Sequence, residues 1–258
     1  MKKLLLLSIL ASMPIRAAIT NFGTAQSVYG NTTSLAVNVP NGGTTVGADT
    51  LVIIQAFDHA GTPGFTTPAG FTVVANIASG SGVDTMTVYY KNYASGSTLP
   101  SSVTVTSLDG GPQYGLICVA YQGHNSTTPF DGTPQTAGQT TPATNTYNAP
   151  SITTTQANDM VVWFGSVFGD VGTGTTTISV GTKNGEVTRA QSGATFYMVA
   201  ANNSQASAGA SGTNTITWGN TQSMILAASL AIAPDTGPAV IGISISGGVS
   251  ISGGVSVQ

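Results

Sequence analysis

The chain has 258 residues, of which 41% are hydrophobic and only 6% are charged, and its formal net charge is −3. This length and apolar content suffice for a folded protein with a real core, and they exclude the high charge and low hydrophobicity that are typical of disordered chains. The six basic residues form no cluster that could bind a phosphate backbone, so the sequence argues against nucleic-acid binding.

Residues 1–18 have two lysines directly after Met1 and continue into an apolar run that includes Leu4, Leu5, Leu6 and Leu7. A charged start followed by such a run is typical of a secretory signal peptide, although Ile15 or Arg16 would occupy a poor position for cleavage. The alternative is a retained docking arm whose four leucines contact a partner. As a helix the run is too short to span a bilayer, so we expect no membrane span in the mature protein.

From about residue 20, short runs rich in Val, Ile, Thr and Tyr alternate with clusters of Gly, Pro, Asn and Ser. Such runs, bounded by turn-forming residues, predict strands, and no window has sustained helical periodicity. The first strands are predicted near residues 37–39, 50–54, 71–74, 85–90 and 103–106. The sequence therefore predicts an all-β protein.

The second half of the chain resembles the first at a nearly constant spacing. Asp159 begins an apolar run 110 positions after Asp49 begins a similar one, and the strand after Thr195 follows the strand after Thr85 at the same spacing. This predicts an internally duplicated antiparallel β-sandwich with two units of jelly-roll or immunoglobulin-like size, residues 19–123 and 143–234. The pattern leaves open whether they form two lobes or one merged sandwich.

A polar connection rich in Pro and Thr is predicted at residues 124–142, and a tail at residues 235–258. In the tail, a six-residue sequence of alternating Ile, Val and Ser with two glycines occurs twice in succession. Ile245, Val249, Ile251 and Val255 are its apolar positions and therefore candidate partner contacts, since such a repeat could add to a neighbouring sheet. The alternative is a flexible tail, because two repeats bury no core of their own.

The sequence offers little for catalysis, and we expect no enzymatic activity, catalytic residue, cofactor or metal. Asp58 and His59 are adjacent, but neighbours on a strand point to opposite faces, so they form no ready dyad. Asp58, Asp84 and Asp170 lie near expected loop ends without the clustering that a calcium site needs, which favours solvated turn residues. The single cysteine, Cys118, lies in an apolar run and is expected to be buried and unreactive.

The aromatic residues suggest sugar stacking at first sight. Trp163 and Trp218 lie within or at the end of predicted strands and are better explained as core or rim packing. Tyr89 and Tyr90 are consecutive on a predicted strand, so one is expected to face outward and to be a candidate partner contact.

Several motifs together resemble a β-sandwich domain family found in phage structural proteins and in secreted bacterial surface proteins. The likeness covers roughly residues 45–233, and its most distinctive part runs from Tyr121-Gln122-Gly123 to Pro129-Phe130-Asp131. The resemblance implies a β-sandwich used for display or assembly, with no catalytic residues.

The scarcity of charge implies a protein that functions within an assembly. Charged residues on edge strands normally prevent sheets of different molecules from pairing, and this chain has few of them. We therefore expect a phage structural protein located in the virion, a head-decoration, fibre or tail-associated component. Its partners would be other virion proteins or copies of itself. The alternative is a secreted cell-surface adhesin or carbohydrate-binding module whose partner is a cell-surface glycan.

Overall fold

Nineteen strands make up the secondary structure of the residues that the computed structural model describes, which are 18–59, 64–79, 82–108, 113–139, 145–169, 176–191, 194–218 and 224–235. All strand pairs in this part of the chain are antiparallel. The predicted all-β class is confirmed. A helix able to cross a membrane is not found among these residues.

Two large sheets form the centre of the molecule. The first central sheet has the strand order β1 (Thr20–Asn21), β9 (Tyr114–Gln122), β4 (Thr50–His59), β7 (Asp84–Tyr93) and β6 (Thr72–Ala78), and β2 (Gln26–Gly30) also pairs with β9. The second central sheet has the order β10 (Gln135–Gln139), β19 (Met224–Ile232), β13 (Asp159–Gly169), β16 (Ala194–Gln205) and β15 (Thr182–Gln191).

A small three-stranded sheet covers the outer face of each central sheet. The first outer sheet has the order β3 (Ser34–Asn38), β8 (Ser102–Ser107) and β5 (Phe65–Thr66). The second outer sheet has the order β11 (Thr146–Ala149), β18 (Asn214–Thr217) and β14 (Thr177–Ile178). Beside it, β12 (Thr153–Thr154) pairs with β17 (Gly209–Ala210).

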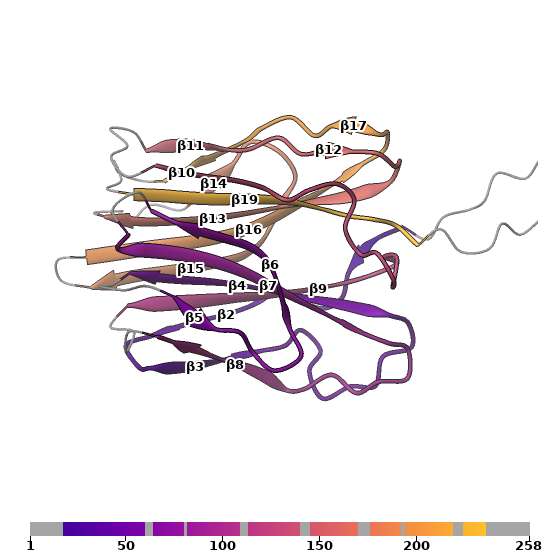
Figure 1. Ribbon diagram of the computed structural model, residues 1–258, viewed down its shortest axis with the longest axis horizontal. Helices are drawn as coiled ribbons and strands as arrows, with labels where there is room; N and C mark the ends of the chain where they lie inside the picture. Colours follow the sequence, from indigo (N-terminus) through magenta and orange to yellow (C-terminus); the bar gives the residue numbers. More distant parts are fainter. Residues whose placement is uncertain are drawn as a thin grey trace, which may run out of the picture.

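The sheets stack as four layers with an apolar core in each of the three gaps, as Figure 1 shows from the β11 and β12 strands at the top to β3 and β8 at the bottom. The middle core draws on both halves of the chain, since it contains Ile53 and Phe57 as well as Phe164 and Phe196. The two halves therefore share one continuous core and do not form separate lobes.

This stacking explains the unbroken apolar runs in the central strands β4 and β13. Successive side chains on a strand point to opposite faces, so a strand covered on both faces needs apolar residues at every position. On β13, Val162 packs into the middle core while its neighbour Trp163 packs against the second outer sheet. On β4, Ile53 and Ile54 divide in the same way between the middle core and the first outer sheet.

The edge strands β6 and β15 carry matching irregularities. The pairing of β6 with β7 shifts register between Val73 and Ala75, and that of β15 with β16 shifts between Lys183 and Gly185. A β-bulge bends and twists a strand, which makes an edge a poor template for another chain. The bulge on β6 protects an edge strand without charged residues, whereas β15 also carries Lys183, Glu186 and Arg189.

The predicted connection at residues 124–142 is structured over much of its length. Single β-bridges join His124 to Pro234 and Phe130 to Ile232, so the segment runs along the end of β19. Strand β10 then forms the edge of the second central sheet. The boundary expected at residue 142 is therefore too late, because a strand of the second half already begins at Gln135.

Gly115 on β9 allows the two central sheets to approach closely. A Cβ atom at this position would lie 2.7 Å from Cε2 of Phe196 and 2.8 Å from Sδ of Met198. We expect Gly115→Ala to lower the free energy of unfolding by about 1–3 kcal/mol, because overpacking displaces core side chains. Urea unfolding measures this loss. Gly47→Ala is the matched control, since Gly47 is exposed with no atom within 4 Å, and an equal loss in both variants would contradict the prediction.

Candidate functional site

Polar side chains gather at one end of the molecule where the two halves meet. His59 is the last residue of β4 and lies opposite Asp84, the first residue of β7, and Nδ1 of His59 is hydrogen bonded to the Asp84 carboxylate. The His59 ring stacks on Phe168 of β13, with ring centroids 3.2 Å apart. The His59 side chain is 25% exposed, whereas that of Asp84 is 4% exposed. This cluster, His59, Asp84 and Phe168, joins the first half to the second.

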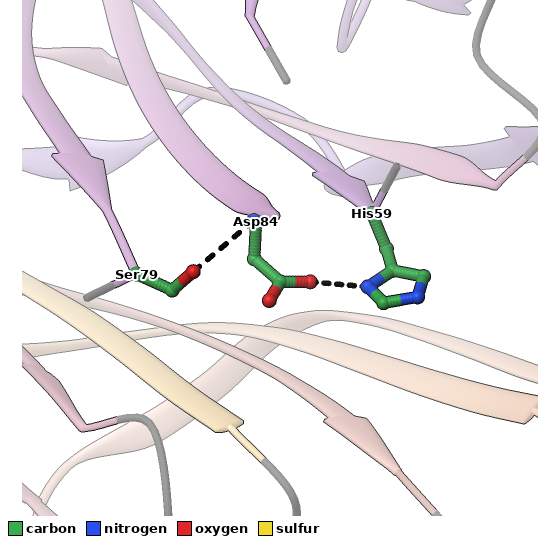
Figure 2. Close-up of polar contacts among 3 residues, drawn as sticks. All are labelled: His59, Ser79 and Asp84. Carbon is green, nitrogen blue, oxygen red and sulfur yellow. Dashed lines mark hydrogen bonds and ion pairs between the residues drawn. The ribbon is translucent and has the colours of Figure 1, made fainter. Parts of the chain in front are cut away.

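The cluster contains a serine, but its geometry is not that of a catalytic triad. Figure 2 shows Ser79 and His59 on opposite sides of Asp84. The Ser79 hydroxyl accepts a hydrogen bond from the backbone N–H of Asp84 at 3.2 Å. A nucleophilic serine needs its hydroxyl on the second imidazole nitrogen of the histidine, and here the carboxylate stands between them. The arrangement fixes the orientation of the imidazole.

The expectation that the acids near strand ends are solvated is wrong for Asp58 and Asp84, because both are buried. The Asp58 carboxylate accepts a hydrogen bond from the Ser107 hydroxyl at 2.7 Å. Asp58 and His59 thus have different partners, in agreement with their opposite directions on the strand. Asp170 lies outside the described residues. No group of three or more metal-ligating side chains occurs in the described part of the chain.

His124 is buried where the connection between the halves begins. The amide of Asn92 is oriented by its Nδ2, which donates to the Ser126 carbonyl at 3.0 Å, so its Oδ1 accepts from Nε2 of His124 at 2.9 Å. This assigns the proton of the neutral imidazole to Nε2, and Nδ1 is buried with no hydrogen-bond partner. Burial lowers the pKa of His124, although the negative charges of Asp49 and Asp235 oppose that shift.

The lowered pKa of His124 predicts a loss of stability in acid. Below its ordinary pKa of 6.5 the unfolded chain binds a proton that the folded chain takes up only at lower pH, so the free energy of unfolding falls as the pH drops below 6.5. Urea unfolding between pH 8 and pH 5 should show a smaller decline for His124→Gln, whose amide nitrogen can still donate to Asn92. Equal declines in the two proteins would contradict this assignment.

The acid of the Pro129-Phe130-Asp131 motif fastens the connection to the second half. The Asp131 carboxylate accepts hydrogen bonds from the Thr155 hydroxyl at 2.7 Å and from the backbone N–H groups of Thr155 and Gln156. Burial alone would raise the pKa of Asp131, but these bonds and a further one with Asp159 outweigh burial and lower it. We call this arrangement the Asp131 clasp. The clasp holds the connection to the segment between β12 and β13.

The candidate contact residues Tyr89 and Tyr90 point to opposite faces of the first central sheet, and both rings pack against other parts of the protein. Tyr89 is 1% exposed in the core beneath the first outer sheet, where burial raises its pKa to about 12. Tyr90 packs against the middle core and meets the ring of Phe130 edge-on at 4.9 Å. Tyr89 is therefore fully covered and Tyr90 is half-buried, and a partner contact at Tyr90 stays a prediction.

The other sequence expectations divide into two groups. Trp163 and Trp218 are both 1% exposed, which confirms them as core residues. Cys118 is also buried as expected, and burial raises the pKa of its thiol. Eight candidate partner contacts lie outside the described residues, namely Leu4, Leu5, Leu6, Leu7, Ile245, Val249, Ile251 and Val255.

A pocket that the sequence did not suggest opens where β9 and the turn between β1 and β2 meet β15. Its volume is about 180 Å³, and Lys183 and Asn184 both line it. Consecutive strand residues normally face opposite ways, but Asn184 is the extra residue of the β15 bulge, and a bulge redirects side chains. Gly185 lets β15 come close, since a Cβ atom there would lie 2.7 Å from Cγ2 of Ile117.

Only the rarity of basic residues in the sequence pointed to this pocket. After residue 20 the chain has three basic residues, and Lys183 is one of them. A bulge cannot be located from the alternation of residue types, so Asn184 gave no signal. Comparisons with protein-family models, with curated proteins and with solved structures found no match to this chain.

Proposed function

We propose that this chain is a non-enzymatic structural protein of a phage virion, a head-decoration, fibre or tail-associated component that acts by assembly and surface display. One observation carries the proposal. The outer faces of the two outer sheets bear Ser, Thr, Asn and Ala, and the six strands that form these sheets contain no charged residue. The two faces lie on opposite sides of the molecule (Figure 1).

These faces are ordered by hydrogen bonds between neighbouring strands. On the first outer sheet the hydroxyls of Ser34 and Thr106, which are paired across β3 and β8, lie 2.9 Å apart. On the second, the Thr215 hydroxyl donates to Oδ1 of its partner Asn148 at 2.7 Å. A rigid uncharged face can pack against another protein without like-charge repulsion and with little loss of side-chain freedom. Two such faces allow one molecule to bridge two neighbours.

We further infer that the two halves arose by internal duplication of one sandwich-like unit. The order β9-β4-β7-β6 corresponds to β19-β13-β16-β15, and β3-β8-β5 corresponds to β11-β18-β14. Nε2 of Gln55 donates to the carbonyl of Gly165 at 2.9 Å, and these positions are 110 residues apart. Contact between corresponding positions is what a near-twofold relation between two copies produces, so this bond supports the inference.

The assembly role is tested by placing one charge on each face. Thr104→Lys and Asn148→Lys alter exposed positions of the two outer sheets, and Ala206→Lys, at an exposed turn, is the control. We expect changes of about 0.5 kcal/mol or less in unfolding free energy for all three. Only the first two should reduce self-association in sedimentation velocity and incorporation into particles from the native source. A wild-type chain that stays monomeric and is absent from those particles would refute the role.

The second candidate is a secreted adhesin or carbohydrate-binding module, which the pocket beside β15 favours. The two candidates differ in the fate of residues 1–18. The intact mass of the protein from its native source should be that of the full chain for a virion component. A mass lower by the first seventeen or eighteen residues would indicate secretion and favour the second candidate.

A further inference from the structure

The pocket beside β15 is small and has two different walls. Its volume of about 180 Å³ is below the range of roughly 300–1,000 Å³ typical of sites for drug-sized ligands, so it admits a single ring or a smaller group. One wall is apolar and is formed by Ala25 and Val119; Ala120 also borders the pocket, but its side chain packs beneath the first outer sheet. The polar side chains belong to Asn21, Thr24, Lys183 and Asn184. A sugar ring, with apolar C–H groups on its face and oxygens at its edge, matches such walls.

The polar wall consists mainly of hydrogen-bond donors. Lys183 is the only charged side chain among the described residues that line the pocket, and its ammonium donates to the Thr176 carbonyl at 3.0 Å, which directs its side chain. Nδ2 of Asn184 is buried and meets no acceptor with good hydrogen-bond geometry, although the Asn184 side chain lies near enough to the Tyr121 hydroxyl to lower the pKa of Tyr121 against the larger effect of burial. A buried donor without an acceptor costs free energy, and rotation of this amide toward a ligand oxygen would recover the loss.

Asn21 completes the donor set. Its Oδ1 accepts a hydrogen bond from Nδ2 of Asn202 at 2.7 Å, and that same Nδ2 lies 3.2 Å from the Tyr121 hydroxyl. The amide of Asn21 is thereby oriented, with its own Nδ2 on the branch away from Asn202. A lysine and two amide donors, with no carboxylate among the lining residues, favour a ligand rich in oxygen acceptors that carries negative charge.

We propose that this pocket binds an acidic sugar, a hexuronic acid residue of a glycan, with its carboxylate at Lys183 and Asn184 and its ring against the apolar wall. The inference deepens the second candidate function by naming a site and a ligand class, and it stands independently of the assembly role. The assembly role is judged by sedimentation and particle content, and the pocket by ligand titration, so the failure of one is distinguishable from the failure of the other.

The test is an NMR titration of the full chain with three probes. Glucuronate is the proposed ligand, glucose has the same ring without the carboxylate, and acetate has the carboxylate without the ring. We expect glucuronate to shift the backbone amides of residues 21–25, 119–120 and 183–184 with millimolar affinity. Glucose and acetate should each bind at least about tenfold more weakly. Equal affinity for glucose or acetate, or no shift at these amides, would overturn the proposal.

Two variants and a control assign the binding to the pocket. Lys183→Gln should weaken glucuronate binding by about tenfold through loss of charge, and Asn184→Ala should weaken it through loss of the amide donor. Lys91→Gln is the control, because Lys91 lies on β7 near the rings of Phe71 and Tyr93 rather than at the pocket. Unchanged affinity in Lys183→Gln, with a folded amide spectrum, would overturn the assignment.

Discussion

Replacement of Phe57 with alanine is expected to lower the free energy of unfolding by about 3–5 kcal/mol, because the ring is fully buried in the core that both halves share. Phe57 lies on β4 in the first half, and its ring centroid is 5.7 Å from that of Phe196 in the second half. The lost contacts therefore belong to both central sheets. Tyr29→Ala serves as the control, since Tyr29 is 53% exposed and its loss should cost about 0.5 kcal/mol or less.

The two tryptophans make this experiment a test of the shared core as well as of stability. Trp163 and Trp218 both lie in the second half and are buried, so their fluorescence reports the unfolding of that half. If the halves unfold together, Phe57→Ala will move the tryptophan transition to lower urea concentration. A tryptophan transition that stays at the wild-type midpoint would show that the halves unfold independently.

Combining Phe57→Ala with Phe196→Ala measures the direct contact between the halves. Tilted aromatic pairs of this kind couple by about 0.5–1.5 kcal/mol, so the double variant should lose less than the sum of the single losses. Strictly additive losses would contradict a direct interaction between these rings.

The second large effect is expected at the Asp131 clasp. Asp131→Ala should lower the free energy of unfolding by about 2–3 kcal/mol, because it leaves the backbone N–H groups of Thr155 and Gln156 without their charged acceptor. Asp131→Asn should cost less, since one amide oxygen still accepts. Thr127→Ala, an exposed change in the same segment, is the control and should have little effect.

The clasp also predicts how the effect depends on pH. The folded-state pKa of Asp131 lies below its ordinary value of 3.8, so its contribution is complete above that value and is lost as the pH falls through the folded-state pKa. The difference between wild type and Asp131→Asn in urea unfolding should therefore be largest near pH 7 and should shrink below pH 3.8. A difference that stays constant down to pH 2 would show that the carboxylate charge plays no part.

The strands could be read from the sequence because their signals are local. The apolar runs at residues 50–54 and 85–90 lie within β4 and β7, although both strands extend several residues further. The ends were missed because Gln55, Asp58 and Asn92 break the apolar pattern while remaining in the sheet. Gln55 can be polar there because its amide donates to Gly165 and Ser166 in the facing sheet.

The parts that the sequence could not supply depend on which layers meet. One of the two rings of Tyr89 and Tyr90 was expected to face outward, because alternation on a strand does not reveal that the second central sheet and Phe130 pack against the face that carries Tyr90. His59 and Asp84 are 25 residues apart, and only the pairing of β4 with β7 brings them together. Predicting the pocket would have required two further facts. One is the bulge at Asn184, and the other is that β15 of the second central sheet lies close to β9 of the first.

The shared middle core has a consequence for synthesis on the ribosome. Strand β9 ends at Gln122, whereas β19 ends at Ile232, which is 110 residues later. At translation rates of roughly 5–20 residues per second, the interval is on the order of ten seconds. Until it ends, the sheet that covers the face carrying Ile53 and Phe57 is incomplete, because its strand β19 is made last. A nascent chain of this protein thus exposes an apolar surface while the ribosome makes its cover, and this is the stage at which a chaperone would have its target.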